Sequence, residues 1–418
     1  MNQCIVKKGI RFYFIPADRF KTVSVRVNLY RPLCREEAAK NALIARLLKA
    51  ACAPYPSPLA LNRALDELYG ASLSAEIVKR GETAALSFGL NYVKDAYTGE
   101  QGTEQAALRL LCQVIGEPLL EEGGFSKEFF QLERENLKRQ ILNRINDKKT
   151  YAMERCYEEM CREEPFGVYE YGKAEDLDSL TPQSLYRHYQ EILKSPMDVF
   201  VCGDADQDQI ISLFTAVFQP SQPMPATSVI KEVSRVHRVT EELDVNQGKL
   251  SLGFRTGTEP DDPEFPALYL YNSILGSGVH SKLFRNVREK LSLAYYAFSR
   301  LERFKGVMLI SSGIEFDKFQ QTYEEILLQM EEMKQGNISD EELSSANSSI
   351  ANQLRAINDT PSALLDYAMI QALMKEETSP EEMIQKLKKV TKEQIAAAAQ
   401  KVQLDTVYFL KNKGGNAQ

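Results

Sequence analysis

The chain has 418 residues, of which 44% are apolar and 26% are charged, and its formal net charge is −7. This length predicts two domains, and the composition is that of a globular protein rather than a disordered one. The acidic balance argues against a nucleic-acid partner, and neither a membrane-spanning run nor a secretory signal is readable, so we expect a soluble, cytoplasmic protein.

The first half of the chain alternates strand and helix patterns. Period-two and apolar-stripe patterns predict a strand, an apolar helix, a strand pair, further helices and a final short strand. In chain order these fall at 23–29, 36–53, 72–80 with 83–90, 103–116, a long helix opened by Ser126, a helix opened by Thr181, and 197–202.

The second half repeats this order. Matching patterns fall at 249–254, 264–275, 293–300 with 306–313, 318–335, a helix opened by Ser339, a helix opened by Thr391, and 406–410. Arg144-Ile145-Asn146-Asp147 also recurs as Ala356-Ile357-Asn358-Asp359. We therefore predict an α+β fold built from two homologous α/β sandwich units, each a mainly antiparallel sheet with helices packed on it.

The repeat boundary falls in a stretch rich in Pro, Ser and Thr, as linkers are. It predicts an N-terminal unit over 1–218, a linker over 219–238 and a C-terminal unit over 239–418. The last residues, 411–418, are predicted to be a frayed tail.

One segment of the second half carries a specific resemblance. GSGVHSKLFRNVREKLSLAYY, residues 276–296, resembles the C-terminal half of the insulinase/pitrilysin family of HxxEH (inverzincin) zinc peptidases, which includes the mitochondrial processing peptidases. The resemblance implies two units facing each other as half a clamshell. It also implies that Arg288 and Tyr295 hold the substrate peptide, beside a turn of Gly276, Ser277 and Gly278 whose amides can meet it.

Each of these residues also has an ordinary interpretation. Arg288 could make a surface ion pair and Tyr295 could pack on a sheet, as most such residues do. The glycine turn could simply end a helix, because glycine accommodates positive φ. The order of the motifs favours the substrate-binding interpretation of Arg288 and Tyr295.

The zinc-binding half of the resemblance fails. A peptidase of this family carries HxxEH on a helix, where two His ligate zinc and the Glu acts as general base. Aligned here are Ala45 and Lys49 at the ligand positions, Leu48 at the base position, and Gln140 at the position of the last ligand, while Glu133 of the same long helix is retained. We therefore predict a buried core helix with no metal, no catalytic residue and no cofactor in this chain.

The other potential metal ligands do not repair this loss. The only histidines are His188, His237 and His280, and none has a His partner four residues away. Seven cysteines lie in the first half with no zinc or redox spacing, which indicates reduced structural thiols.

Two functions remain open at this stage. The chain could be the substrate-binding subunit of a heteromeric peptidase whose zinc lies in an HxxEH-bearing paralogous partner. Alternatively it could be a non-proteolytic scaffold or peptide-binding protein; the resemblance extends to the YmfF-type bacterial branch, which lacks the zinc motif and is associated with elongation factor P modification. The sequence leaves homodimer formation open, and its net charge favours basic peptides as ligands over acidic ones.

Overall fold

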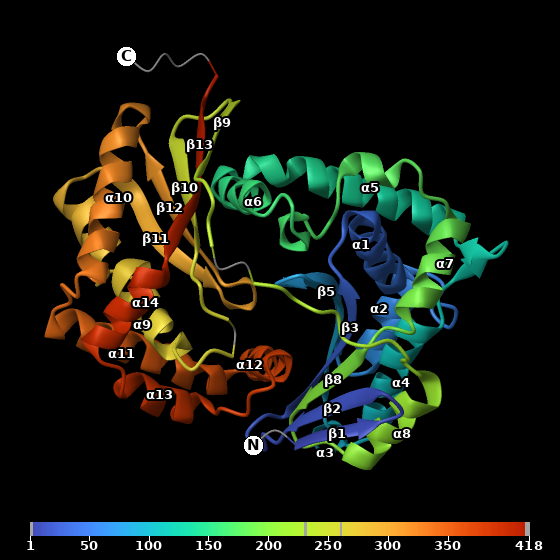
Figure 1. The fold of residues 1–418 in the computed structure, drawn as a ribbon. Helices are drawn as coiled ribbons and strands as arrows, with labels where there is room; N and C mark the ends of the chain where they lie inside the picture. The colour runs from blue at the N-terminus through green and yellow to red at the C-terminus, as the bar shows by residue number, and fades with distance from the viewer. Residues whose placement is uncertain (1–2, 230–231, 260, 414–418) are drawn as a thin grey trace. The chain divides into compact units, whose positions relative to one another are not determined.

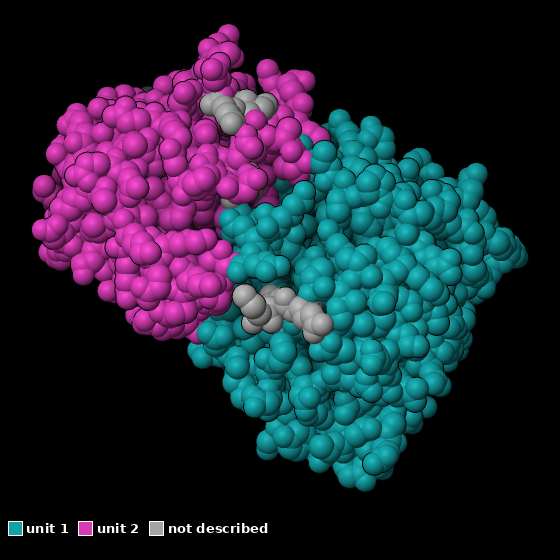
Figure 2. Space-filling model, turned by 60° about the horizontal axis from the view of Figure 1, so that its bottom comes forward, with its two compact units in different colours: residues 1–143, 168–226, 357–377 teal, residues 144–167, 227–356, 378–418 magenta. Residues whose placement is uncertain are grey.

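The chain folds into two compact units, each made of separate stretches of sequence (Figure 2). The computed structural model describes residues 3–229, 232–259 and 261–413. Unit 1 comprises residues up to 143, 168–226 and 357–377, and unit 2 comprises 144–167, 227–356 and the residues from 378 onward. The prediction divided the chain into contiguous stretches at 218 and 239, whereas in the structure each unit includes a segment from the other half.

Unit 1 is built on a six-stranded mixed sheet (Figure 1). Its strand order is β1-β2-β8-β3-β5-β4, with β2 and β8 parallel and the other pairs antiparallel. The strands are β1 (Gln3–Lys7), β2 (Ile10–Ile15), β3 (Thr22–Pro32), β4 (Ser72–Arg80), β5 (Thr83–Val93) and β8 (Met197–Cys202). A separate two-stranded ribbon joins β6 (Leu120–Glu121) to β7 (Gly124–Phe125).

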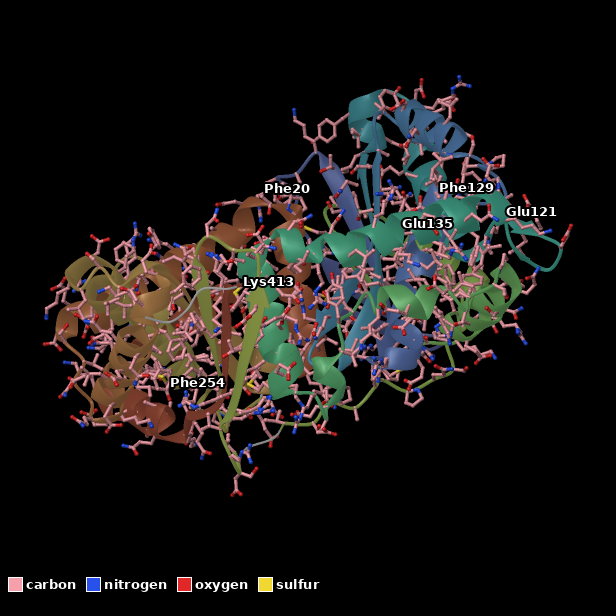
Figure 3. The ribbon with its side chains drawn as sticks, turned by 90° about the horizontal axis from the view of Figure 1, so that it is seen from above. Phe20, Glu121, Phe129, Glu135, Phe254 and Lys413 are labelled. Carbon is pink, nitrogen blue, oxygen red and sulfur yellow. The ribbon has the colours of Figure 1, made fainter. Side chains whose placement is uncertain are left out.

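Unit 1 also contains helices, several of which bury the apolar side chains of the sheet. They are α1 (Arg35–Ala50), α2 (Pro58–Glu67), α3 (Asp95–Thr98), α4 (Thr103–Gly116), α5 (Lys127–Asn143), α7 (Pro182–Ile192), α8 (Gln207–Val217) and α12 (Pro361–Met374), with a 3₁₀ turn at Ala174–Leu177. Alternate residues of β3, from Val23 to Leu29, are buried in the main core with the apolar side chains of α1 and α4. The helix α5 is marked by Phe129 and Glu135 in Figure 3.

Unit 2 is built on a five-stranded mixed sheet in the order β11-β12-β10-β13-β9. The strands are β9 (His237–Leu243), β10 (Gly248–Arg255), β11 (Ala294–Glu302), β12 (Val307–Ile314) and β13 (Gln403–Asn412). The helices are α6 (Lys148–Met160), α9 (Phe265–Gly276), α10 (Phe319–Lys334), α11 (Asp340–Ala356), α13 (Pro380–Lys388) and α14 (Lys392–Lys401). A π-helix spans Leu283–Lys290, and short 3₁₀ turns lie at 144–146, 165–167, 303–305 and 316–318, while the turn at 357–359 belongs to unit 1.

The two sheets share one topology. Reading β4-β5-β3-β8-β2 against β11-β12-β10-β13-β9 matches every strand in position, and the pairs β2–β8 and β9–β13 are both parallel. This match confirms the predicted α+β class with two homologous sandwich units, and the additional strand β1 distinguishes unit 1. A shared order with a shared parallel pair is what a gene duplication leaves behind.

One helix from each half of the sequence packs on a sheet formed by the other half, and so belongs to the unit built on that sheet. In unit 1, α12 covers the second face of the sheet, where Leu365, Ala368 and Met369 pack with Phe200 and Cys202. In unit 2, α6 lies against β10 so closely that a Cβ on Gly253 would stand 2.7 Å from the sulfur of Met160. Each sheet is thus buried on both faces.

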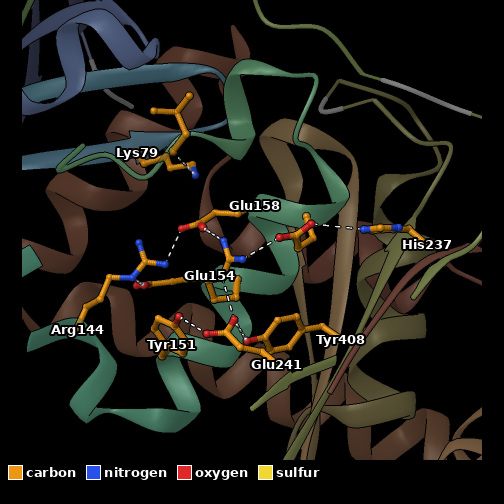
Figure 4. Close-up of polar contacts among 11 residues, drawn as sticks. Lys79, Arg144, Tyr151, Glu154, Glu158, His237, Glu241 and Tyr408 are labelled. Atoms are coloured by element: carbon orange, nitrogen blue, oxygen red, sulfur yellow. Dashed lines mark hydrogen bonds and ion pairs between the residues drawn. The ribbon is translucent and has the colours of Figure 1, made fainter. Parts of the chain in front are cut away.

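A polar network also fixes α6 to unit 2 (Figure 4). The carboxylate of Glu241 on β9 accepts hydrogen bonds from the hydroxyls of Tyr151 on α6 and Tyr408 on β13, each at 2.7 Å. The guanidinium of Arg155 on α6 lies 3.3 Å from Glu241 and 2.8 Å from Glu159. These contacts explain why residues 144–167 belong to unit 2 although they follow unit 1 in the chain.

The cysteines are all free, and five of the seven are buried. Burial raises the pKa of the thiols of Cys112 and Cys161 to about 12. None of the described helices combines the length and apolarity that crossing a bilayer requires. The predicted tail is wrong at 411 and 412, which end β13 and pair with β9, and its residues 414–418 lie outside the described part of the chain.

Candidate functional site

The positions aligned with the zinc motif are part of the core of unit 1. Ala45 and Leu48 of α1 are each 2% exposed and pack in the main hydrophobic cluster, while Lys49 is exposed in the last turn of the helix. The predicted buried core helix is therefore present, three residues shorter at its C-terminus than the pattern indicated. Alanine and leucine supply no donor atom to a metal.

Arg46 hydrogen-bonds the two α5 residues at the former zinc site, Glu133 and Gln140. Arg46 of α1 donates one hydrogen bond to Glu133 at 3.0 Å and another to the side-chain oxygen of Gln140, both on α5. Tyr171 hydrogen-bonds Gln140 as well. The retained carboxylate of Glu133 thus has a guanidinium as its cation, supplied by the chain itself.

These residues do not fit a zinc ion. The part of the chain that the structure describes contains no group of three or more His, Cys, Asp and Glu side chains placed to hold a metal. Four-coordinate zinc needs at least three protein ligands, and the guanidinium of Arg46 adds positive charge where a dication would have to bind.

We expect zinc and chelators to leave the thermal stability of the protein unchanged. A ligand that binds the folded state raises the melting temperature, and this chain offers no ligand set for the metal. Melting curves with equimolar zinc, without zinc and with EDTA test this, and an HxxEH peptidase of known zinc content serves as a positive control. A zinc-dependent rise in melting temperature that EDTA reverses would contradict it.

Arg288 of unit 2 lies on a rare backbone form. Residues 283–290 form a π-helix, and the amide of Leu291 bonds the carbonyl of Asn286, five residues back. Such helices are rare, occur mostly as single turns inside α-helices, and are frequent at functional sites. The guanidinium of Arg288 lies 4.6 Å from the ring centre of Phe284 and 3.5 Å from Glu289, and its side chain is 43% exposed.

The neighbouring residues of this π-helix are held by the elements packed against it. Asn286 donates to Gln329 of α10 at 2.8 Å, and Lys282 pairs with Glu342 of α11 at 3.0 Å. The ring contact and the ion pair of Arg288 are both with side chains of its own helix. Its side chain is therefore partly exposed to solvent, while its helix is held by the neighbouring elements.

Tyr295 lies on a second irregularity seven residues later. Ala294 pairs with Ile314 and Tyr296 with Gly313, so Tyr295 is the extra residue of a β-bulge. Ser292, three residues before Tyr295 and ahead of the strand, has a φ of 49°, a left-handed conformation that a non-glycine residue rarely adopts. Bulges re-aim side chains, and Tyr295 is 60% exposed.

The hydroxyl of Tyr295 donates a hydrogen bond to the carboxylate of Glu315, which follows β12. This hydrogen bond, together with the negative charge of Glu315, raises the pKa of the tyrosine. Tyr295 therefore stays a neutral hydrogen-bond donor at physiological pH, held by an acceptor that a ligand can displace.

The predicted glycine turn divides into two parts. Gly276 ends α9 and is buried, and a Cβ there would stand 2.4 Å from the backbone nitrogen of Ser299 on β11. Ser277 follows it as the C-cap, half-buried, and Gly278 is exposed with a φ of 97°. Gly276 thus serves the packing of α9 on β11, and only the exposed end of the turn offers backbone to a ligand.

Sequence reasoning missed two contacts of these sites. Nothing in the local pattern indicated that Glu315 would meet Tyr295, because their pairing depends on the bulge. Arg46 could have been found, since a retained Glu133 on a half-buried helix requires a cation. The structure brings Gly276, Ser277, Gly278, Arg288 and Tyr295 into unit 2, and Ala45, Leu48, Lys49 and Gln140 into unit 1.

The chain has the two-sheet duplicated fold and the degenerate metal motif of a non-catalytic metallopeptidase relative. A family model described as the peptidase M16 inactive domain matches residues 179–350. The chain is 35% identical over 412 residues to the probable inactive metalloprotease YmfF of Bacillus subtilis, covering 97% of both proteins. It belongs to the M16 peptidase family, the insulinase/pitrilysin family of the predicted resemblance.

Solved structures share this fold. A conserved protein from Enterococcus faecalis V583 superposes with a TM-score of 0.93 at 29% identity, covering 99% of each chain. The peptidase M16 inactive domain from Pseudomonas fluorescens superposes with a TM-score of 0.81 at 16% identity, covering 99% of this chain and 98% of that one. The second likeness bears on the fold alone.

Proposed function

We propose that the chain is the peptide-binding subunit of a heteromeric peptidase, in which an HxxEH-bearing paralogous partner supplies the zinc. The observation that carries this proposal is a contrast between the two sites. Of the four zinc positions, Ala45 and Leu48 lie in the core, Lys49 is exposed and Gln140 binds Arg46. In contrast, Arg288 and Tyr295 remain exposed on two irregular backbone segments.

Irregular backbone of this kind costs free energy and is retained where it serves a function. A left-handed serine costs on the order of 1–3 kcal/mol, and the bulge gives up a regular strand pair. The left-handed Ser292 and the bulge at Tyr295 add nothing to the core, because the side chain of Tyr295 is exposed. Binding a peptide through a guanidinium fork and a phenol hydroxyl would account for both.

The first experiment is a pull-down of the tagged chain from its own cells, with companions identified by mass spectrometry. A stoichiometric HxxEH-bearing companion supports the proposal and supplies the pair for peptide-cleavage assays. If the chain instead purifies alone, as a homodimer or with unrelated proteins, the proposal fails and a non-proteolytic scaffold, including one linked to elongation factor P modification, becomes the better account.

With the pair in hand, Tyr295→Phe is expected to lower kcat/KM for peptide cleavage about 100-fold, the typical effect of removing one donor to a developing oxyanion. Arg288→Ala is expected to lower it by a similar order, because the guanidinium fork is lost. Arg285→Ala is the matched control: it lies on the same π-helix, is 45% exposed and pairs only at the surface with Glu341. Equal activity of all three variants and the parent pair would contradict the assignment of the site.

A further inference from the structure

Unit 2 contains an open cavity of about 360 Å³ at the end of its sheet where β9 leads into β10. It is lined by the loop between these strands, the start of β10 and the first residue of α6: Lys148, Asp244, Val245, Asn246, Gln247 and Lys249. The cavity is separate from Arg288 and Tyr295, which do not line it.

Lysines and aromatic rings gather beside this cavity. The ammonium of Lys149 on α6 lies 4.6 Å from the ring centre of Tyr296 and 4.5 Å from that of Phe298. The ammonium of Lys249 lies 5.7 Å from the ring centre of Tyr296. Two cations therefore share one aromatic ring, a contact that offsets their mutual repulsion in part.

The absence of a side chain at Gly313 makes room for the ring of Tyr296 beside Lys249. Gly313 of β12 lies between Tyr296 and Lys249 in the strand register, so the three residues form one row on the face that α6 covers. A Cβ on Gly313 would stand 2.5 Å from the ring of Tyr296 and 2.8 Å from the side-chain oxygen of Gln247. Glycine therefore lets the tyrosine ring lie across β12 toward the cavity.

The positive charge is only partly compensated. Lys249 donates to the neutral side chain of Gln247, and burial, together with the nearby charge of Lys149, lowers its pKa. Asp147, the nearest carboxylate in sequence, caps α6 through Thr150, at 3.1 Å to the amide and 2.6 Å to the hydroxyl, and its negative charge opposes the lowering of the pKa of Lys249. Among the described residues, Lys148, Lys149 and Lys249 form no ion pair, and Asp244 at the rim is exposed.

Like charges held together beside a cavity favour an anionic ligand. The sheet register places this cavity at the same end as Tyr295: β10 begins, β12 ends and β11 begins there. Adjacent strands are roughly 4.8 Å apart, so a peptide bound at Tyr295 reaches β10 within a few residues.

We propose that this cavity binds a carboxylate of the peptide that Arg288 and Tyr295 hold, with the ammonium groups of Lys249, Lys149 and Lys148 as its partners. This inference rests on the proposed peptide binding and narrows it to peptides with an acidic side chain or a free C-terminus near the bound segment. It is a local exception to the net charge of −7, which alone would favour basic ligands.

Direct binding to the intact chain tests the inference without a partner. The probes are fluorescein-labelled decapeptides of one base sequence, ending in three Asp residues with a free carboxylate, in three Asp residues with an amide, or in three Asn residues with an amide. Fluorescence anisotropy is expected to show the first or second probe binding at least roughly tenfold more tightly than the third. The ranking of the first two separates a C-terminal carboxylate from an acidic side chain.

The variants Lys249→Gln and Lys149→Gln are expected to remove this preference, whereas Lys388→Gln on the exposed surface of α13 leaves it intact. Melting curves of each variant establish that it is folded. If the lysine variants keep the preference while Arg288→Ala abolishes binding, the cavity inference is wrong and the proposed function stands. If no probe binds the parent chain, or if all three bind equally, the inference is overturned as well.

Discussion

Replacing Lys305 with methionine is expected to lower the free energy of unfolding of unit 2 by about 3–5 kcal/mol, because it removes one member of a buried ion network. The side chain of Lys305 is 0% exposed, and its ammonium lies 2.5 Å from Glu164 and 2.7 Å from the carbonyl oxygen of Ser228. Arg255, 3% exposed, also binds Glu164 at 2.5 Å and Asp405 at 2.9 Å.

These contacts join two cations, Lys305 and Arg255, to two carboxylates, Glu164 and Asp405. Without the ammonium of Lys305, Glu164 and Asp405 face a single guanidinium in a place with little water, and an uncompensated buried charge is costly. The two cations hold the pKa of Glu164 below its ordinary value against the opposing effect of burial. The glutamate is therefore ionised in the folded state.

Urea unfolding of the parent and of Lys305→Met, followed by far-ultraviolet circular dichroism, measures the loss. The exposed Lys388→Met is the control and is expected to change stability by no more than about 0.5 kcal/mol. The pair Glu164→Leu and Lys305→Met should cost clearly less together than the sum of the single variants, because each single change leaves the other's charge unpaired. Additive losses would show that the two groups do not interact.

This network also concerns the exchanged segment 144–167. Glu164 belongs to that segment, whereas Arg255, Lys305 and Asp405 belong to strands and turns of the second half. Weakening the network should therefore expose α6, and limited proteolysis of Lys305→Met should cut within 144–167 before it cuts elsewhere.

The duplicated fold was readable from the sequence because it rests on local patterns repeated in order. Alternation along β3 and β10, and apolar stripes on α1 and α9, specify strand, helix and buried face wherever they occur. The bounds were close: the predicted helix 318–335 is α10, and the predicted strand 306–313 is β12 shifted by one residue.

The exchange of α6 and α12 could not be read in this way. An apolar helix face indicates that the helix packs on a sheet, but it does not indicate which one, because both sheets have an apolar face. What assigns α6 to unit 2 is a set of long-range partners, such as Tyr151 with Glu241 and Arg255 with Glu164. The same limit applies to the zinc positions, where the loss of ligands was readable but the replacement by Arg46 depends on the packing of α1 on α5.

The geometry at Arg288 and Tyr295 was also beyond the sequence. The segment 283–290 reads as an amphipathic α-helix, and the difference between hydrogen bonds to the fourth and fifth residue leaves no mark on the pattern. The bulge at Tyr295 likewise shifts the register by one residue, and no glycine stands there as a sequence signal for it. The resemblance supplied the identity of both residues, and the structure supplied the backbone that presents them.

Acidification from pH 7 to pH 4 is expected to destabilise unit 1 through His188. Burial lowers the pKa of this histidine to about 4, with the positive charges of Arg31 and Lys40 acting in the same direction and the carboxylate of Glu37 opposing them. Its Nε2 lies 2.8 Å from the side-chain oxygen of Asn41, which is 1% exposed. A neutral imidazole with its proton on Nε2 donates this hydrogen bond. A second proton on the ring therefore adds no hydrogen bond to Asn41 in the folded state.

The sign follows from the proton count. Between pH 6.5 and 4 the unfolded chain binds a proton at His188 while the folded chain does not, so stability is complete above pH 6.5 and falls as the pH falls. The shift amounts to on the order of 3 kcal/mol at full development.

In His188→Gln, whose amide can still donate to Asn41, this loss should be absent. The difference between the parent and variant unfolding curves at pH 7, 6, 5 and 4 isolates the contribution of His188 from that of the carboxylates. Parallel curves for the parent and His188→Gln would mean that His188 takes up its proton as readily in the folded protein as in the unfolded chain.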